Sequence, residues 1–148
     1  MNIVVYTDGA CSSNPGIGGW GAVILIPTKS PVYLHGGSDQ TTNNQMELTA
    51  VINALKYFKE HQNIKVCTDS KYVLNGIKSW IINWKKNGWK TAAKKPVKNK
   101  ELWERLDTQI TKHKIQWQWI KGHAGNEHNE MADILARRYI EKVNEIII

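Results

Sequence analysis

The segment NIVVYTDG (residues 2–9) determines the centre of the fold that the sequence predicts. Its first six residues are rich in β-branched and aromatic side chains, which are typical of a strand. Asp8 and Gly9 follow, and turn-forming residues continue to Gly16, so we expect the strand to end in a loop. The segment therefore predicts a central strand with a carboxylate directly after its end.

The next elements predict a sheet with a helix packed on it. Residues 20–26 and 32–36 resemble strands that flank a turn at 27–31, so the first three strands form an antiparallel meander. Apolar side chains then recur at helical spacing over about 43–59. Residues 64–68 form a short buried strand, and the helical crossover allows it to lie parallel to the first strand.

The remaining third of the chain adds helices and one more strand. Residues 71–86 and 101–112 are predicted to be helical, with an exposed loop at 88–100 between them. Residues 115–120 alternate apolar and polar side chains as a fifth strand, and a final helix covers about 126–142. The order of elements predicts an α/β fold with helices covering a mixed sheet, and we expect one domain over residues 1–148.

The positive charge is concentrated in one part of the chain. The net charge is +7, yet residues 70–100 contain nine lysines and no acidic residue, whereas the rest has 11 Lys and Arg against 13 Asp and Glu. Such concentration favours a polyphosphate partner, because neutralising each phosphate releases condensed counterions. A solubilising lysine-rich face is the alternative interpretation.

Two further features indicate where the protein works. The longest aliphatic run, residues 23–26, is far shorter than the roughly 20 residues of a membrane span, and Met1 leads into strand-like sequence without a signal-peptide pattern. Cys11 and Cys67 form no CxxC pair, so we expect free thiols in a reducing compartment. The expectation is a soluble, cytoplasmic monomer.

Three acidic residues occur where a purely structural role would be unusual. Asp8 and Asp69 each follow a hydrophobic strand, and the carboxyl ends of neighbouring parallel strands border the usual ligand site of an α/β sheet. Glu47 lies on the inward stripe of its helix, four residues before Val51 and seven before Ala54. A carboxylate at that position is costly unless it is paired or binds a metal.

Asp133, in the final helix, is a candidate fourth carboxylate. Clustered acids without matching cations favour a hard divalent ion. Each acid also has an ordinary interpretation: Asp8 as a turn residue, Asp69 as a helix cap, Glu47 as a solvated helix residue and Asp133 as a surface acid. Taken singly, the residues leave these alternatives open.

Four motifs taken together are much more specific. They are Thr7-Asp8-Gly9, Met46-Glu47-Leu48, Thr68-Asp69-Ser70, and Gly122-His123-Ala124-Gly125 through Asn129-Glu130-Met131-Ala132-Asp133. With these motifs the chain closely resembles type 1 ribonuclease H, from about Ile3 to Arg137. The resemblance implies a five-stranded mixed sheet, three strands antiparallel plus two parallel, flanked by helices. It also implies an endonuclease that hydrolyses the RNA strand of RNA–DNA hybrids.

The resemblance further assigns a metal site and its chemistry. The carboxylates matching Asp8, Glu47, Asp69 and Asp133 hold two Mg²⁺ ions, with Mn²⁺ able to substitute, and hydrolysis leaves 5′-phosphate and 3′-hydroxyl ends. His123 assists proton transfer or product departure, for which its titration range is suited. The other histidines lack this context and are expected at the surface; they are His35, His61, His113 and His128.

Contacts to the nucleic acid are assigned in the same way. The RNA contacts map onto short polar groups and nearby backbone that reach 2′-hydroxyls, at Cys11, Asn14, Asn43 and Asn44. Turn and capping roles are the alternative for these four residues. Tyr72 and Trp80 face the DNA strand, and Thr42 with Asn99 grips a DNA phosphate.

A basic handle at about 80–100 supplies further contacts, including Trp84, Lys85 and Lys86. Trp80 and Trp84 share a helix face, so a structural hydrophobic stripe is the alternative for them. The chain departs from the family at two substrate positions. Gln40 stands where many members have an arginine, which weakens the expected phosphate grip, and Lys71 replaces a neutral residue and adds a backbone contact.

Two other classes of function compete with this interpretation. Integrases, transposases and junction resolvases set carboxylates on a similar sheet but act on DNA; the match at Asn43-Asn44 and the lysine-tryptophan handle disfavour them. A nucleic-acid-binding module without catalysis needs only the basic window, but it leaves Glu47 unexplained.

Overall fold

Five strands pair into one mixed sheet in the computed structural model, which describes residues 2–122 and 125–147. The spatial order is β3-β2-β1-β4-β5, in which the first three strands are antiparallel and β4 and β5 run parallel to β1. This confirms the predicted α/β class. The strands are β1 (Ile3–Cys11), β2 (Gly16–Leu25), β3 (Val32–Thr41), β4 (Asn63–Thr68) and β5 (Lys114–Trp119).

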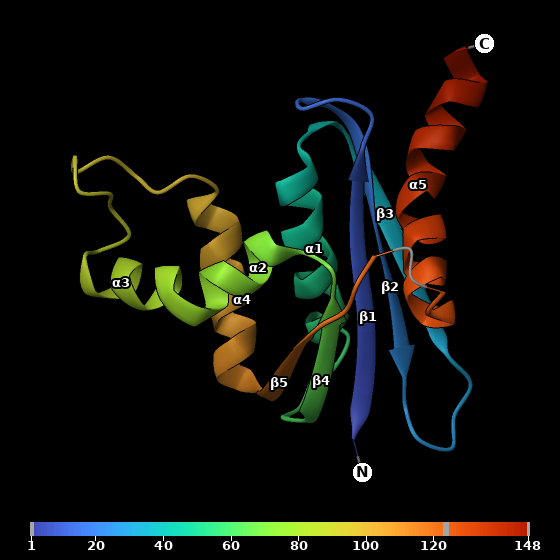
Figure 1. Ribbon diagram of the computed structural model, residues 1–148, viewed down its shortest axis with the longest axis horizontal. Coiled ribbons are helices and arrows are strands. Elements are labelled where there is room, and N and C mark those ends of the chain that lie inside the picture. The colour runs from blue at the N-terminus through green and yellow to red at the C-terminus, as the bar shows by residue number, and fades with distance from the viewer. Residues whose placement is uncertain (1, 123–124, 148) are drawn as a thin grey trace.

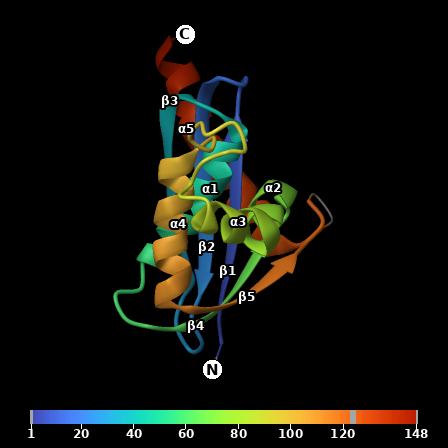
Figure 2. The same ribbon diagram turned by 90° about the vertical axis from the view of Figure 1, so that its left-hand side faces the viewer.

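Helices cover both faces of the sheet. They are α1 (Asn43–Lys56), α2 (Lys71–Asn75), the π-helical turn η1 (Gly76–Trp80), α3 (Ile81–Lys86), α4 (Lys100–Lys112) and α5 (Glu127–Ile147). Figure 1 shows α5 on one side of the sheet and α1 with α4 on the other, while α2 and α3 extend away from it. The side view in Figure 2 shows α4 and α3 in front of the strands.

The first strand is longer than the sequence predicts. Instead of ending at Thr7, β1 continues through Asp8 and Gly9 to Cys11, because these residues remain paired with β2, Asp8 opposite Gly21. The parallel pairing with β4 stops earlier, at Thr7 opposite Thr68. Asp8 therefore lies inside a strand, just beyond the point where its parallel neighbour ends.

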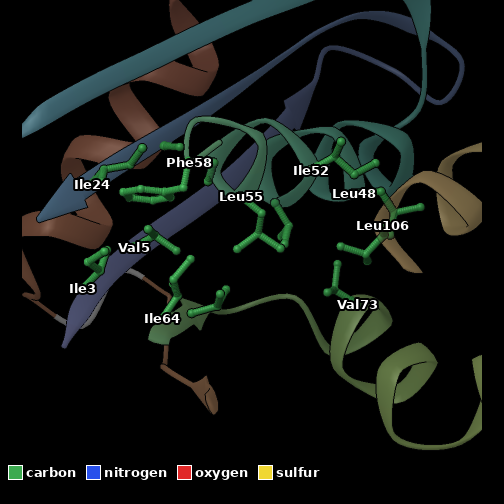
Figure 3. Close-up of a cluster of buried hydrophobic side chains, with 14 of the residues drawn as sticks. Ile3, Val5, Ile24, Leu48, Ile52, Leu55, Phe58, Ile64, Val73 and Leu106 are labelled. Atoms are coloured by element: carbon green, nitrogen blue, oxygen red, sulfur yellow. The ribbon is translucent and has the colours of Figure 1, made fainter. Parts of the chain in front are cut away.

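The main core lies between the sheet and the helices α1 and α4. The inward stripe of α1 packs against β1, β2 and β4, and Trp103 and Leu106 of α4 close the far side. Figure 3 shows these side chains converging from different elements, among them Ile3, Val5, Ile24, Leu48, Ile52, Leu55, Phe58, Ile64, Val73 and Leu106. This cluster fixes the angle at which α1 crosses the strands.

His113 corrects one expectation: it is buried rather than at the surface, with 5% of its area exposed. Its ring nitrogens meet backbone groups, since Nδ1 accepts from the Gln62 amide at 3.1 Å and Nε2 lies 3.2 Å from the Leu55 carbonyl oxygen. Burial lowers the pKa of the ring, which favours the neutral form. His35 and His61 are exposed as expected, and His128 is half-buried against the Tyr6 ring.

Within the part of the chain that the structure describes, no helix combines the length and the apolar character that crossing a membrane requires.

The junction of α2 and η1 depends on a close contact between Gly76 and Trp103. Both residues are buried, and a Cβ at position 76 would overlap the indole ring of Trp103. The absence of a side chain at Gly76 therefore lets the handle helices lie against α4.

We expect Gly76→Ala to destabilise the fold by about 1–3 kcal/mol, because the added methyl overpacks a filled core. Urea denaturation of the variant and of wild type measures this difference. Ser79→Ala, at an exposed position of η1, is the control and is expected to stay within about 0.5 kcal/mol of wild type. Equal stability of the two variants would show that α4 and η1 can separate without cost.

Candidate active site

The parallel pairing of β1 and β4 brings Asp8 and Asp69 together. Thr7 lies opposite Thr68, so the next residue of each chain segment emerges at the same edge of the sheet. Gly9 lets α1 approach this edge, since a Cβ there would lie 2.5 Å from the Glu47 amide nitrogen. The close approach delivers Glu47 to the two aspartates.

The three carboxylates form one compact group. A ligand oxygen from each of Asp8, Glu47 and Asp69 lies within 4.8 Å of the other two. Asp8 is 7% exposed and Glu47 is 5% exposed. Asp133, on α5, lies close enough to Asp8 that its carboxylate is among the causes that raise the pKa of Asp8. All four line a cleft of about 390 Å³ together with Gly9, Asn43, Asn44, Ser70, Lys71 and Tyr72.

Burial and mutual repulsion disfavour the charged forms of this group. Burial, reinforced by the charge of Asp69, raises the pKa of Asp8 to about 8. Burial is also the main cause that raises the pKa of Glu47 well above its usual value, followed by the charges of Asp8 and Asp69. Close carboxylates without a compensating charge behave in this way.

The donor set fits a hard divalent cation. One oxygen of Glu47, Oε2, is buried without a hydrogen-bond partner, and in the described ranges neither Asp8 nor Glu47 forms an ion pair with lysine or arginine. Mg²⁺ is bound in proteins by carboxylate oxygens and water. A cation here would satisfy the unpartnered oxygen and offset the repulsion.

Asp133 differs from the other three carboxylates in its surroundings. Its side chain is 21% exposed, and its Oδ2 lies 3.1 Å from Nη2 of Arg137, one turn later on α5. It is not among the three residues within 4.8 Å of one another. Asp133 therefore borders the cleft from the side of α5.

Polar residues predicted to contact RNA gather beside the cleft at the start of α1. Asn43 and Asn44 line the cleft itself, and the Asn14 side chain accepts a hydrogen bond of 2.9 Å from the Asn43 amide. A second hollow, of about 460 Å³, is lined by Asn14, Pro15, Thr42, Asn43, Asn44 and Lys98. Cys11 lies nearby, with Sγ 3.4 Å from the Thr41 carbonyl oxygen.

Two of the residues predicted to bind a DNA phosphate form hydrogen bonds within the protein. Thr42 caps α1, because its hydroxyl accepts from the Gln45 amide at 3.2 Å. The Asn99 side chain accepts from Gln45 Nε2 at 3.1 Å and donates to the Tyr72 hydroxyl at 3.0 Å. Gln40 is exposed near the end of β3 and lines neither the cleft nor this hollow.

The handle residues form an aromatic wall that is joined to the core. Tyr72, Trp80 and Trp84 line a hollow of about 230 Å³ with Lys98. The same rings pack on the buried Trp103, with ring centroids 5.3–6.4 Å apart. These aromatic side chains therefore have a structural role in the core, and they also present one side to a hollow where a ligand has room to bind.

The lysines of the handle region differ in their surroundings. Lys85 pairs with Asp107 at 3.3 Å, whereas Lys86 is exposed without an ion pair in the described residues. Lys71 lines the cleft, and its Nζ lies 5.8 Å from the centre of the Trp119 ring. His123 falls outside the residues that the structure describes.

Sequence reasoning missed three residues beside these hollows. Lys98 lines two of them, Trp119 is 48% exposed next to Lys71, and Arg137 holds Asp133. Of these three residues, only Arg137 was predictable from the sequence, because a basic residue four positions after an acid on a helix indicates an ion pair.

Comparison with known proteins shows relatives that match the chain along most of its length. The RNase H family model matches residues 1–141. Ribonuclease H of Alcanivorax borkumensis is 54% identical over 142 residues, which make up 96% of this chain and 93% of the relative. Ribonuclease HI of Neisseria meningitidis serogroup A is 54% identical over 138 residues, covering 93% of this chain and 94% of the relative.

Two solved structures share the fold. LC9-RNase H1, described as a type 1 RNase H with the type 2 active-site motif, gives a TM-score of 0.80 at 29% identity over 93% of this chain and 71% of that chain. RNase H1 of the archaeon Halobacterium salinarum gives a TM-score of 0.71 at 23% identity over 96% and 99% of the two chains. The resemblance to type 1 ribonuclease H is confirmed, and the chain belongs to the ribonuclease H family of nucleases.

Proposed function

We propose that this protein hydrolyses the RNA strand of RNA–DNA hybrids by two-metal-ion catalysis and leaves 5′-phosphate and 3′-hydroxyl ends. The observation that carries the proposal is the buried carboxylate group, in which Glu47 Oε2 has no hydrogen-bond partner. When bound, two Mg²⁺ ions, or Mn²⁺ in their place, lower the pKa of an attacking water and stabilise the leaving oxygen.

Asp8, Glu47, Asp69 and Asp133 hold the ions in this proposal. Their positions on β1, α1, the end of β4 and α5 are set by four separately packed elements, so the ligand oxygens need little rearrangement on binding. Preorganised ligands of this kind stabilise charge without reorganisation during the reaction. His123 assists proton transfer or departure of the product.

The hybrid is held by the surfaces on either side of the cleft. Cys11, Asn14, Asn43 and Asn44 contact the RNA strand, where the 2′-hydroxyl distinguishes RNA from DNA. Two further groups serve the rest of the hybrid. Tyr72, Trp80 and Trp84 face the DNA strand, and Gln40, Thr42, Lys71, Lys85, Lys86 and Asn99 contact backbone.

We further propose that residues 1–148 form a single domain that acts as a cytoplasmic monomer. The family model supports one domain, since it matches residues 1–141. Sedimentation of the purified protein tests the oligomeric state.

Cleavage of a labelled RNA–DNA hybrid, duplex RNA and duplex DNA, each with and without Mg²⁺, tests the proposal. We expect the hybrid alone to be cut, in its RNA strand and only with the metal. Cutting of duplex DNA would favour an integrase-like or resolvase-like activity, and binding without cutting would favour a module without catalysis.

Asp8→Asn, Glu47→Gln and Asp69→Asn are each expected to nearly abolish cleavage, because each removes one charge from the metal ligands. Affinity for the hybrid in low salt should change only a few-fold, because lysines supply most of the binding. Asp133→Asn should be milder, since water can replace part of a ligand at the edge of the cleft. Glu60→Gln, at an exposed acid that does not line the cleft, is the control. Substantial activity in one variant would remove that residue from the site.

The raised pKa of Asp8 predicts an effect on stability. A folded pKa of about 8, against 3.8 for the ordinary group, means that ionised Asp8 opposes folding. This penalty on folding is absent below the pKa of Asp8 in the unfolded chain, and it grows as the pH rises from there toward the pKa of Asp8 in the folded protein. In chelator at pH 7, Asp8→Asn should therefore raise the melting temperature, by about 2–4 °C for each kcal/mol of penalty that it removes.

Two conditions sharpen that measurement. The gain in melting temperature should shrink near pH 4, where folded Asp8 is protonated and unfolded Asp8 is about half protonated, so that little of the penalty remains. It should also shrink in Mg²⁺, which stabilises the wild-type native state by binding it. A lower melting temperature of Asp8→Asn in chelator at both pH values would identify Asp8 as a hydrogen-bonded structural residue.

Replacing Lys86, Lys94 and Lys95 by Ala is expected to weaken hybrid binding and to flatten its dependence on the logarithm of salt concentration. The slope should fall by about 0.9 for each phosphate that the protein no longer neutralises. Lys85 is kept, because it pairs with Asp107. The control changes three exposed lysines outside the handle, Lys29, Lys59 and Lys114, by the same charge. If both triple variants show the same salt dependence, the handle lysines make no special phosphate contacts and form only a solvated surface.

A further inference from the structure

Asp133 is tied to a cation on its own helix. Arg137 donates through Nε to Asp133 Oδ2 at 3.1 Å, and its Nη2 lies 3.1 Å from the same oxygen. Arg137 is about half exposed, whereas Asp133 is four-fifths buried at the edge of the cleft. An exposed pair at this spacing adds little to stability, so the location of the pair matters more than its strength.

The geometry divides the two oxygens of Asp133. Both contacts from Arg137 end on Oδ2 and neither ends on Oδ1, and the Asp133 side chain lines the cleft together with Asp8. The guanidinium of Arg137 thus holds the carboxylate from the side of α5, at the edge of the cleft. Rotation of the carboxylate would break both contacts with Arg137.

Arg137 is itself restrained along the helix. Its Nη1 lies 3.7 Å from Glu141 Oε1, one turn further on, so acids at both i−4 and i+4 orient the guanidinium. Arginine presents a planar fork of donors in a fixed geometry, which a lysine ammonium does not reproduce.

We propose that Arg137 is a positioning residue for the divalent-ion site: it holds Asp133 in the orientation in which one carboxylate oxygen faces the cleft. The inference rests on the proposed function, because it takes Asp133 as a metal ligand. Hydrogen-bond partners of ligating groups typically account for 10- to 100-fold in metal affinity or activity. Arg137 is expected to act within that range.

The test compares Arg137→Lys, which keeps the charge but loses the fork, with Arg137→Gln, which loses both. Arg138→Gln is the matched control, because Arg138 is the next residue of α5, is exposed and loses the same charge without a contact to Asp133 in the described residues. Mg²⁺ binding to the free protein is measured by calorimetry, and kcat and KM for the hybrid are measured at saturating Mg²⁺.

Both Arg137 variants are expected to bind Mg²⁺ about 10-fold more weakly and to lower kcat with KM nearly unchanged. Arg138→Gln should stay within about twofold of wild type in all three quantities. In an Asp133→Ala background, Arg137→Gln should have no additional effect, because the carboxylate that Arg137 contacts is absent.

Three results would overturn the inference. Wild-type behaviour of Arg137→Lys would show that charge alone matters, and tighter Mg²⁺ binding by Arg137→Gln would show that Arg137 only opposes the cation. Equal effects of Arg137→Gln and Arg138→Gln would show that the Arg137–Asp133 pair is only a surface contact without a role in metal binding. Failure of wild type itself to bind Mg²⁺, or full activity of Asp8→Asn, would instead overturn the proposed function.

Discussion

The parallel pairing of β1 with β4 is the constraint on which the site depends. Because this pairing ends at Thr7 and Thr68, the two following aspartates emerge side by side, while β1 is still held by β2 on its other edge. The residue after Asp8 on β1 is Gly9, whose lack of a side chain lets α1 bring Glu47 close to the two aspartates. A shift of one residue in this register would turn Asp8 to the opposite face of the sheet, away from Glu47 and Asp69.

The packing of the core opposes the repulsion within the carboxylate group. Glu47 and Asp8 are buried at a cost, yet Leu48, Val51 and Leu55 of α1 are fully buried against the sheet. Burial of such side chains contributes about 1.5–3 kcal/mol each, enough to hold α1 in place without a cation. The site can therefore be preformed, with a ligand set that gains stability when a metal neutralises it.

Much of this arrangement was predictable from periodicity and from strand ends. The inward stripe of the first helix identified Glu47, and the ends of two apolar strands identified Asp8 and Asp69, because burial and topology follow from local pattern. The true length of β1 was not predictable, since residues 8–11 have the turn-forming composition of a loop and extend the strand only through backbone pairing with β2. The burial of His113 was missed because its partners, Gln62 and Leu55, lie more than 50 residues away.

The handle and the cleft depend on a shared structural anchor. Trp103, on α4, is fully buried and meets the rings of Tyr72, Trp80 and Trp84, while its indole nitrogen donates to the Tyr72 hydroxyl. Tyr72 also lines the cleft, two residues after Ser70 caps α2. A displacement of the handle would therefore move Tyr72 and the start of α2 next to Asp69. Through this anchor, a surface suited to bind a nucleic-acid backbone and a site suited to cut it keep a fixed distance from each other.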